Sequence, residues 1–96
     1  MKKIKNYING NLVAYSEKYL PVFDPSKGEK ISEVVLSNNS DMEHTIKSAK
    51  NSFLNWSNTT PLKRSRIISK YKEIIEKNIE VLAKLVSNEH GKTLDD

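Results

Sequence analysis

Cysteine is absent from the 96 residues of this chain. Without cysteine the chain can form neither a disulfide scaffold nor a thiolate zinc site, and it holds no nucleophilic thiol. The absence fits a reducing compartment, so we expect a cytoplasmic protein. Any thiol chemistry to which this chain contributes must therefore use a cysteine that lies outside it.

Long hydrophobic runs are also absent. Lys2, Lys3 and Lys5 resemble the basic start of a signal peptide, but no apolar run of about 7–15 residues follows them. No stretch approaches the roughly 20 apolar residues of a membrane-spanning helix, so we expect no membrane partner. The apolar fraction is 36%, below the about 45–50% of an ordinary domain. This deficit predicts a thin core, or apolar faces that further chain covers.

Charge is only mildly biased, with a net charge of +4. The densest basic run comprises Lys63, Arg64, Arg66, Lys70 and Lys72. A nucleic-acid interface needs a broad basic patch with interleaved aromatic side chains or a known module, and the run has Tyr71 alone as an aromatic neighbour. The run is more typical of a solvated or ion-paired helix face, and we expect no nucleic-acid partner.

The residues that could carry chemistry do not form a recognised set. His44 and His90 each lack a Cys, His or carboxylate partner at the spacing of a metal motif. The Gly-Lys-Thr triplet at 91–93 ends like a phosphate-binding loop, but Val86 stands where that loop needs glycine. Asp95-Asp96 is typical of a frayed terminus. The sequence therefore predicts no catalytic, cofactor-binding or metal-binding residue in this chain.

Residues 1–37 carry strand and turn signals. Asn9-Gly10 is a strong hairpin signal, because a type I′ turn needs positive φ at both central positions. Residues 19–23 are predicted to form a strand that its proline confines to an edge. Residues 24–28 supply a turn, and residues 29–36 form a short strand leading away from it.

Residues 40–93 carry helix signals. A capping box predicts the first helix, over about residues 41–56: Ser40 caps the helix and the Glu43 side chain reaches back. One narrow apolar stripe follows the helical period, which predicts that this helix packs on another element. The stripe consists of Met42, Ile46, Ala49, Phe53 and Trp56.

The second helix is predicted over about residues 61–90. Thr60 caps it, Pro61 takes the first helical position, and Gly91 ends it. The short link between the helices predicts an antiparallel helical hairpin over 40–93, so the fold class is α+β. The apolar stripe of this helix comprises Ile67, Ile68, Tyr71, Ile74, Ile75, Ile79, Leu82, Leu85 and Val86.

This second stripe is larger than the stripe of the first helix can cover. Each fully buried aliphatic side chain contributes about 1.5–3 kcal/mol relative to exposure. A chain that left several of them uncovered would be marginally stable and prone to association. We therefore expect something else to pack on the second helix.

Five segments, in this order and spacing, resemble the N-terminal end of the aldehyde dehydrogenase superfamily. Within it the likeness is strongest to the CoA-acylating branch of methylmalonate-semialdehyde dehydrogenases, on Lys5 to Gly10, Pro61 to Arg66 and Glu89 to Asp96. The five segments are Tyr7-Ile8-Asn9-Gly10, Val22-Phe23-Asp24-Pro25-Ser26-Lys27-Gly28-Glu29, Phe53-Leu54-Asn55-Trp56-Ser57, Pro61-Leu62-Lys63-Arg64 and Glu89-His90-Gly91-Lys92-Thr93.

The resemblance implies an NAD-dependent oxidoreductase in which a cysteine thiolate attacks an aldehyde and hydride passes to NAD. The thioester is then transferred to coenzyme A, so that a semialdehyde, CoA and NAD give an acyl-CoA, NADH and CO2. In the family the cysteine, the NAD loops and the oxyanion-hole asparagine lie beyond position 96. The resemblance thus implies that residues 1–96 are an incomplete, N-terminal part of the NAD-binding domain, inactive alone. Its partners would be the remainder of the chain and further copies in a homo-oligomer.

Two alternatives to this assignment stay open. The first is a fragment of a non-acylating NAD(P)-dependent aldehyde dehydrogenase, which hydrolyses its thioester to an acid. The second belongs to another class: a small, non-enzymatic helical-hairpin module that buries its apolar stripe on itself or in a homodimer.

Overall fold

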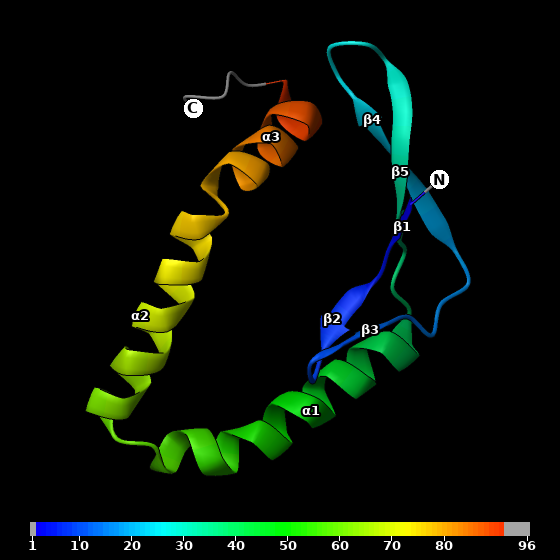
Figure 1. Cartoon of the computed structure of the whole chain (residues 1–96). Helices are drawn as coiled ribbons and strands as arrows, with labels where there is room; N and C mark the ends of the chain where they lie inside the picture. Colours follow the sequence, from blue (N-terminus) through cyan, green and yellow to red (C-terminus); the bar gives the residue numbers. More distant parts are fainter. Residues whose placement is uncertain (1, 92–96) are drawn as a thin grey trace.

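The computed structural model describes residues 2–91 as five short strands followed by three helices (Figure 1). This order confirms the predicted α+β class. The first strand is absent from the sequence prediction, because its lysine-rich sequence has no strand signal of its own. The elements are β1 (Lys2–Ile4), β2 (Asn6–Ile8), β3 (Asn11–Val13), β4 (Tyr19–Asp24), β5 (Glu29–Val35), α1 (Asn39–Asn58), α2 (Pro61–Lys77) and α3 (Ile79–His90).

Strands β2 and β3 form the predicted hairpin around Asn9-Gly10. Asn9 has a φ of 50° and Gly10 a φ of 77°, the two positive angles that a type I′ turn requires. Ile8 pairs with Asn11 across the turn in an antiparallel ladder. Asn9 also lines a shallow polar groove with residues of α1, including His44 and Asn51, so the tip of the hairpin lies beside that helix.

Strands β1, β5 and β4 form a separate sheet in that order, with β1 parallel and β4 antiparallel to β5. Pro21 lies on β4, which is an edge strand, as its missing N–H demands. At the β4–β5 turn the Asp24 carboxylate accepts hydrogen bonds from the backbone N–H and the hydroxyl of Ser26, at 2.9 and 2.6 Å. These bonds lower the pKa of Asp24, and Gly28 completes the turn with a φ of 68°. The turn prediction is confirmed.

The capping box of α1 lies two residues earlier than the sequence predicts. Asn38 is the N-cap: its side chain accepts from the Asp41 N–H at 3.0 Å, and Asp41 Oδ2 accepts from the Asn38 N–H at 3.0 Å. The prediction of Ser40 as cap and Glu43 as its partner is therefore wrong. Both pairs have the spacing of the box, but Asp41 also receives hydrogen bonds from outside the helix, and these select the earlier frame.

The predicted second helix is divided at Asn78 into α2 and α3. Asn78 has φ −113° and ψ 19°. Its backbone N–H donates to the Ile75 carbonyl at 3.0 Å and its side-chain amide donates to the Ile74 carbonyl at 2.8 Å. A side-chain amide that competes for backbone carbonyls in this way interrupts a helix, which corrects the prediction of one helix over 61–90.

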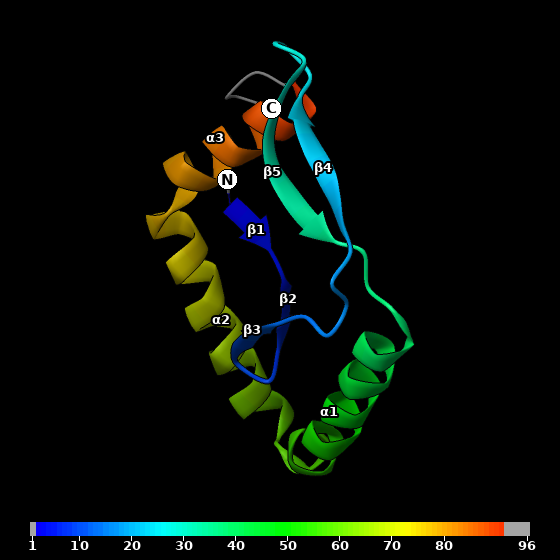
Figure 2. The ribbon, with the colours of Figure 1, turned by 90° about the vertical axis from the view of Figure 1, so that its right-hand side faces the viewer.

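Helices α1 and α2 do not form the compact antiparallel hairpin that the sequence predicts. They diverge from the turn at Thr59-Thr60, and sheet, α1, α2 and α3 together trace a ring (Figures 1 and 2). The ring is thin: its principal extents are 48, 35 and 16 Å. Its radius of gyration is 16.9 Å, against about 12–13 Å for a compact domain of this length. The two helices open because neither buries the apolar stripe of the other.

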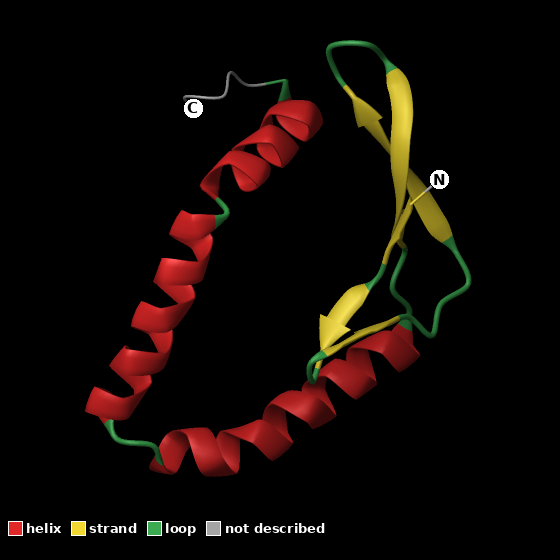
Figure 3. Ribbon diagram, viewed as in Figure 1, coloured by secondary structure: helices red, strands yellow, loops and turns green. Residues whose placement is uncertain are grey.

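Few apolar side chains are buried in the ring. Among the described residues, Ile8 and Val35 are the buried apolar ones, while Asp41 is the most completely buried side chain at 1% exposure. Helices and strands alike leave large apolar side chains at the surface, although the backbone is regular throughout (Figure 3). A buried carboxylate, not a hydrophobic core, therefore occupies the best-protected position in the described chain.

Three separate segments meet at the Asp41 carboxylate. Oδ1 accepts a hydrogen bond from the Tyr15 backbone N–H at 2.8 Å, and Oδ2 accepts from the Ser16 and Asn38 N–H groups at 3.1 and 3.0 Å. The bonds from Tyr15, then from Asn38, are the main causes that lower the pKa of Asp41. The link after β3, the link after β5 and the first turn of α1 are thereby held together.

We expect Asp41→Ala to loosen this junction, because three backbone N–H groups lose their acceptor. Amide hydrogen exchange at Tyr15, Ser16 and Asn38 should accelerate, whereas Glu43→Ala, one turn into the same helix, should leave it unchanged. The Asp41 pKa lies below its ordinary value of 3.8 in the folded chain, so its stabilising effect is complete above that pH and is lost as the pH falls below it. Equal exchange in the two variants would contradict this role.

Candidate functional site

The described residues do not bring a catalytic set together. No group of three or more His, Cys, Asp or Glu side chains that could hold a metal ion occurs in residues 2–91. His44 stacks edge-on against Tyr15, with ring centroids 5.0 Å apart and the Tyr15 hydroxyl 3.4 Å from Nδ1. His90 is exposed in the last turn of α3, where a histidine complements the helix dipole. The structure thus places His44 in a contact with an aromatic ring and His90 at a helix end.

The Gly-Lys-Thr triplet does not form a phosphate-binding loop around its glycine. Gly91 ends α3 in the left-handed conformation, with a φ of 69°, and its N–H donates to the Ser87 carbonyl at 2.9 Å. This confirms Gly91 as the helix stop. Lys92 and Thr93 lie outside the described residues, as does the predicted Asp95-Asp96 terminus.

Gly91 also closes the ring. A Cβ built at position 91 would lie 3.2 Å from Cγ of Pro25 in the β4–β5 turn, so α3 approaches this turn closely because residue 91 has no side chain. The end of α3 indeed lies beside β4 (Figures 1 and 2). Two segments that are far apart in the sequence, the Asp24 to Gly28 turn and the end of α3, therefore form one contact.

Ion pairs do not account for the basic run on α2. In the part of the chain that the structure describes, the ion pairs are Lys30 with Glu33 at 2.6 Å and Lys72 with Glu76 at 3.7 Å. The first of these lowers the pKa of Glu33, mainly through the hydrogen bond from Lys30. Lys72 and Glu76 are both largely exposed, and such a pair adds little stability.

The largest unexplained feature is a set of exposed apolar side chains on the three helices, here termed the apolar face. Its members are between 39% and 65% exposed, although burial of each would contribute about 1.5–3 kcal/mol. It follows the helical stripes of all three helices, as the sequence predicts. The apolar face comprises Met42, Ile46, Phe53 and Trp56 of α1 and Ile67, Ile68, Tyr71, Ile74, Ile79, Leu82, Leu85 and Val86 of α2 and α3.

An exposed apolar surface of this extent is typical of a docking surface. No helix within residues 2–91 is long and apolar enough to cross a membrane. The geometry therefore describes a thin layer of structure with a regular backbone, one anchored junction at Asp41 and a wide exposed apolar surface.

Comparison with known proteins shows the family to which this chain belongs. The sequence profile of the aldehyde dehydrogenase family matches residues 12–96. The chain belongs to the aldehyde dehydrogenase family. As the sequence resemblance implies, it corresponds to the N-terminal region of such enzymes.

Individual relatives agree along the whole chain. Malonate-semialdehyde dehydrogenase of Pseudomonas aeruginosa is 38% identical over 96 residues, which cover 100% of this chain and 19% of the relative. Malonate-semialdehyde dehydrogenase 2 of Bacillus thuringiensis is 40% identical over 94 residues, which cover 97% of this chain and 19% of the relative. A provisionally assigned methylmalonate-semialdehyde dehydrogenase of Sinorhizobium meliloti, solved with NAD, superimposes with a TM-score of 0.96 at 33% identity, over 100% of this chain and 20% of that one.

The chain thus spans about a fifth of the length of the relatives that it matches. Its layer-like shape and its apolar face are connected, since a layer whose shortest extent is 16 Å encloses few side chains. The residue that sequence reasoning missed is Asp41. Its signal in the sequence was an acidic residue three positions after Asn38, but the contacts from Tyr15 and Ser16 could not be read from spacing.

We expect Gly91→Ala to destabilise the chain by about 1–2 kcal/mol, because alanine is strained at positive φ and its Cβ would press on Pro25. Gly28→Ala is the matched control: Gly28 has nearly the same φ but no atom within 4 Å of a built Cβ. Urea unfolding followed by circular dichroism measures both. Equal losses for the two variants would show that the contact with Pro25 contributes nothing.

Proposed function

We propose that this chain is the N-terminal scaffold of the NAD-binding domain of an aldehyde dehydrogenase, and that it is not catalytic by itself. The apolar face carries the proposal: twelve large apolar side chains on three helices are each at least 39% exposed among residues 2–91. The fold of the chain superimposes on a fifth of a solved relative. The domain extends beyond residues 1–96, and the scaffold packs its apolar face on the remainder.

The cofactor sites are assigned to that remainder. NAD is bound in the solved relative from Sinorhizobium meliloti, but residues 2–91 do not fit NAD. The glycines of this region occupy two turns and a helix end and do not form a glycine-rich loop at the start of a helix. The chain also has no cysteine. We therefore place the NAD site, the coenzyme A site and the thiolate in the remaining polypeptide.

The substrate that we propose is malonate semialdehyde or methylmalonate semialdehyde, oxidised with NAD and transferred to coenzyme A with release of CO2. The names of the relatives support this branch, and so does the strong likeness of the segments at the start of the chain, at the start of α2 and at its end. The complete enzyme is proposed to be a cytoplasmic homo-oligomer.

The scaffold role is tested by a chimera. Residues 1–96 replace the matching stretch of the Pseudomonas aeruginosa relative, and we expect a soluble enzyme that reduces NAD with malonate semialdehyde. Ile74→Gln together with Leu85→Gln in the apolar face should abolish soluble enzyme, because two polar groups would be buried against apolar partners. The paired control replaces the exposed Ser69 and Glu73 by Gln and should keep activity. A chimera that does not fold, together with a free chain that forms no complex with the relative lacking its matching stretch, would contradict the scaffold role.

The substrate is tested on the gene itself. We expect the DNA after codon 96 to encode, in frame or after a single frameshift, an active-site cysteine and NAD loops. The expressed polypeptide should then form an acyl-CoA from malonate or methylmalonate semialdehyde when coenzyme A is present. Formation of a free acid independent of coenzyme A would favour the non-acylating branch, and unrelated sequence after codon 96 would favour the interaction module.

A further inference from the structure

The helices place two charged residues within the apolar face. Arg64 precedes Ile67, Ile68 and Tyr71 by three, four and seven positions, so the four side chains share one side of α2. At the other end, Glu89 follows Leu82, Leu85 and Val86 by seven, four and three positions on α3. A positive and a negative group therefore stand near opposite ends of the same stripe.

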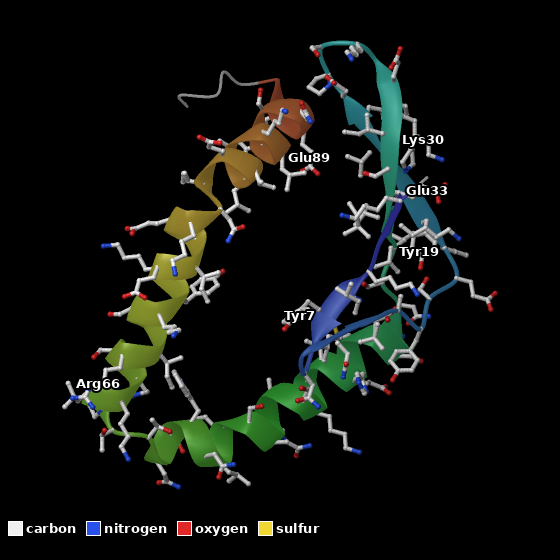
Figure 4. All side chains as sticks on the ribbon, viewed as in Figure 1. Tyr7, Tyr19, Lys30, Glu33, Arg66 and Glu89 are labelled. Atoms are coloured by element: carbon white, nitrogen blue, oxygen red, sulfur yellow. The ribbon has the colours of Figure 1, made fainter. Side chains whose placement is uncertain are left out.

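The neighbouring Arg66 does not share the side of α2 on which Arg64 lies. Arg66 is two positions from Arg64, which places it toward the opposite side of α2, and Figure 4 shows it pointing away from the ring. Arg64 is already partly covered, whereas Arg66 is exposed. Glu89 is exposed and projects from α3 toward the sheet side of the ring (Figure 4). Neither Arg64 nor Glu89 forms an ion pair within residues 2–91.

Covering the apolar face would remove water from both charged groups. A buried charge without a partner is strongly unfavourable, whereas a paired one is tolerated. A purely apolar occupant would therefore be rejected at both ends of the stripe. The occupant must carry complementary charge at two places, some distance apart along one surface.

We propose that the surface covering α2 and α3 presents a carboxylate to the Arg64 guanidinium and a cationic or N–H donor group to the Glu89 carboxylate. The occupant is the remainder of an aldehyde dehydrogenase polypeptide, and this inference rests on the proposed function. The length of the relatives supports that occupant, since the matched stretch is 19% of each. Arg64 and Glu89 thus fix the register in which the scaffold docks, because apolar contacts alone do not specify one.

The experiment uses the chimera of residues 1–96 with the remaining part of the Pseudomonas aeruginosa relative. Arg64→Met keeps the length of the side chain and removes its charge, and we expect it to lower the Tm of the chimera by about 5 °C or more. The matched control Arg66→Met should change the Tm by less than about 1 °C. Glu89→Gln should likewise lower the Tm of the chimera. Its control Glu73→Gln, on the outer side of α2, should leave the Tm nearly unchanged.

The same four variants are measured in the free 96-residue chain, where Arg64 and Glu89 are not covered. In the free chain each variant should have the same Tm as its control. A loss of Tm that occurs only in the chimera is then caused by docking. Equal Tm values for Arg64→Met and Arg66→Met in the chimera, or a higher Tm for Arg64→Met, would overturn the proposal. A free chain that dimerises, and whose dimer is dissolved by Arg64→Met but not by Arg66→Met, would overturn it in favour of a second copy as occupant.

The scaffold role and the charge pairing are tested separately. If the unsubstituted chimera folds and the charge variants behave like their controls, the scaffold role stands and the charge pairing is wrong. If the unsubstituted chimera does not fold, the free chain is added to the relative lacking its matching stretch. Absence of a complex there would overturn both, while a complex that Arg64→Met weakens at least tenfold more than Arg66→Met would support the pairing.

Discussion

The ring depends on the carboxylate of Asp41, whose two oxygens accept three backbone N–H groups from two links that are distant in sequence. A charge in this position is stable because hydrogen bonds replace the water that it loses. The bonds fix where α1 begins and how the β2–β3 hairpin lies relative to the sheet. The direction of α1, and through it the path of α2 and α3, follows from this junction.

The other end of the ring is closed by a van der Waals contact and not by a network of hydrogen bonds to a buried carboxylate. Gly91 allows α3 to approach Pro25, and this contact returns the chain to the sheet from which it started. Between the two junctions the helices are supported by their own hydrogen bonds and leave their apolar side chains exposed. Such a layer is stable in the long term when a second layer covers it, as two-layer packing around a core requires. In the proposed scaffold role, the remainder of an aldehyde dehydrogenase polypeptide supplies that second layer.

In the proposed scaffold role the chain contributes position and not chemistry. The twelve apolar side chains would then give the layer its affinity for the rest of the domain, but apolar contacts are non-directional. Arg64 and Glu89 are the features that would make docking directional, since each requires a particular partner at a particular place. The polar outer side of α2, with Arg66 and Lys70, would stay in contact with water when the apolar face is covered.

Local signals were enough to predict the Asn9-Gly10 hairpin, the Asp24 to Gly28 turn, the stop at Gly91 and the apolar stripes, because each depends on backbone angles or spacing within a few residues. The family likewise follows from five linear segments. The break at Asn78 is also local, because its amide and N–H donate to carbonyls of the preceding turn, but helical periodicity alone does not reveal it. Tertiary structure alone decided two things. Asp41 replaced Glu43 in the capping box because Tyr15 and Ser16 donate to it from outside the helix, and the helices diverge because neither buries the apolar stripe of the other.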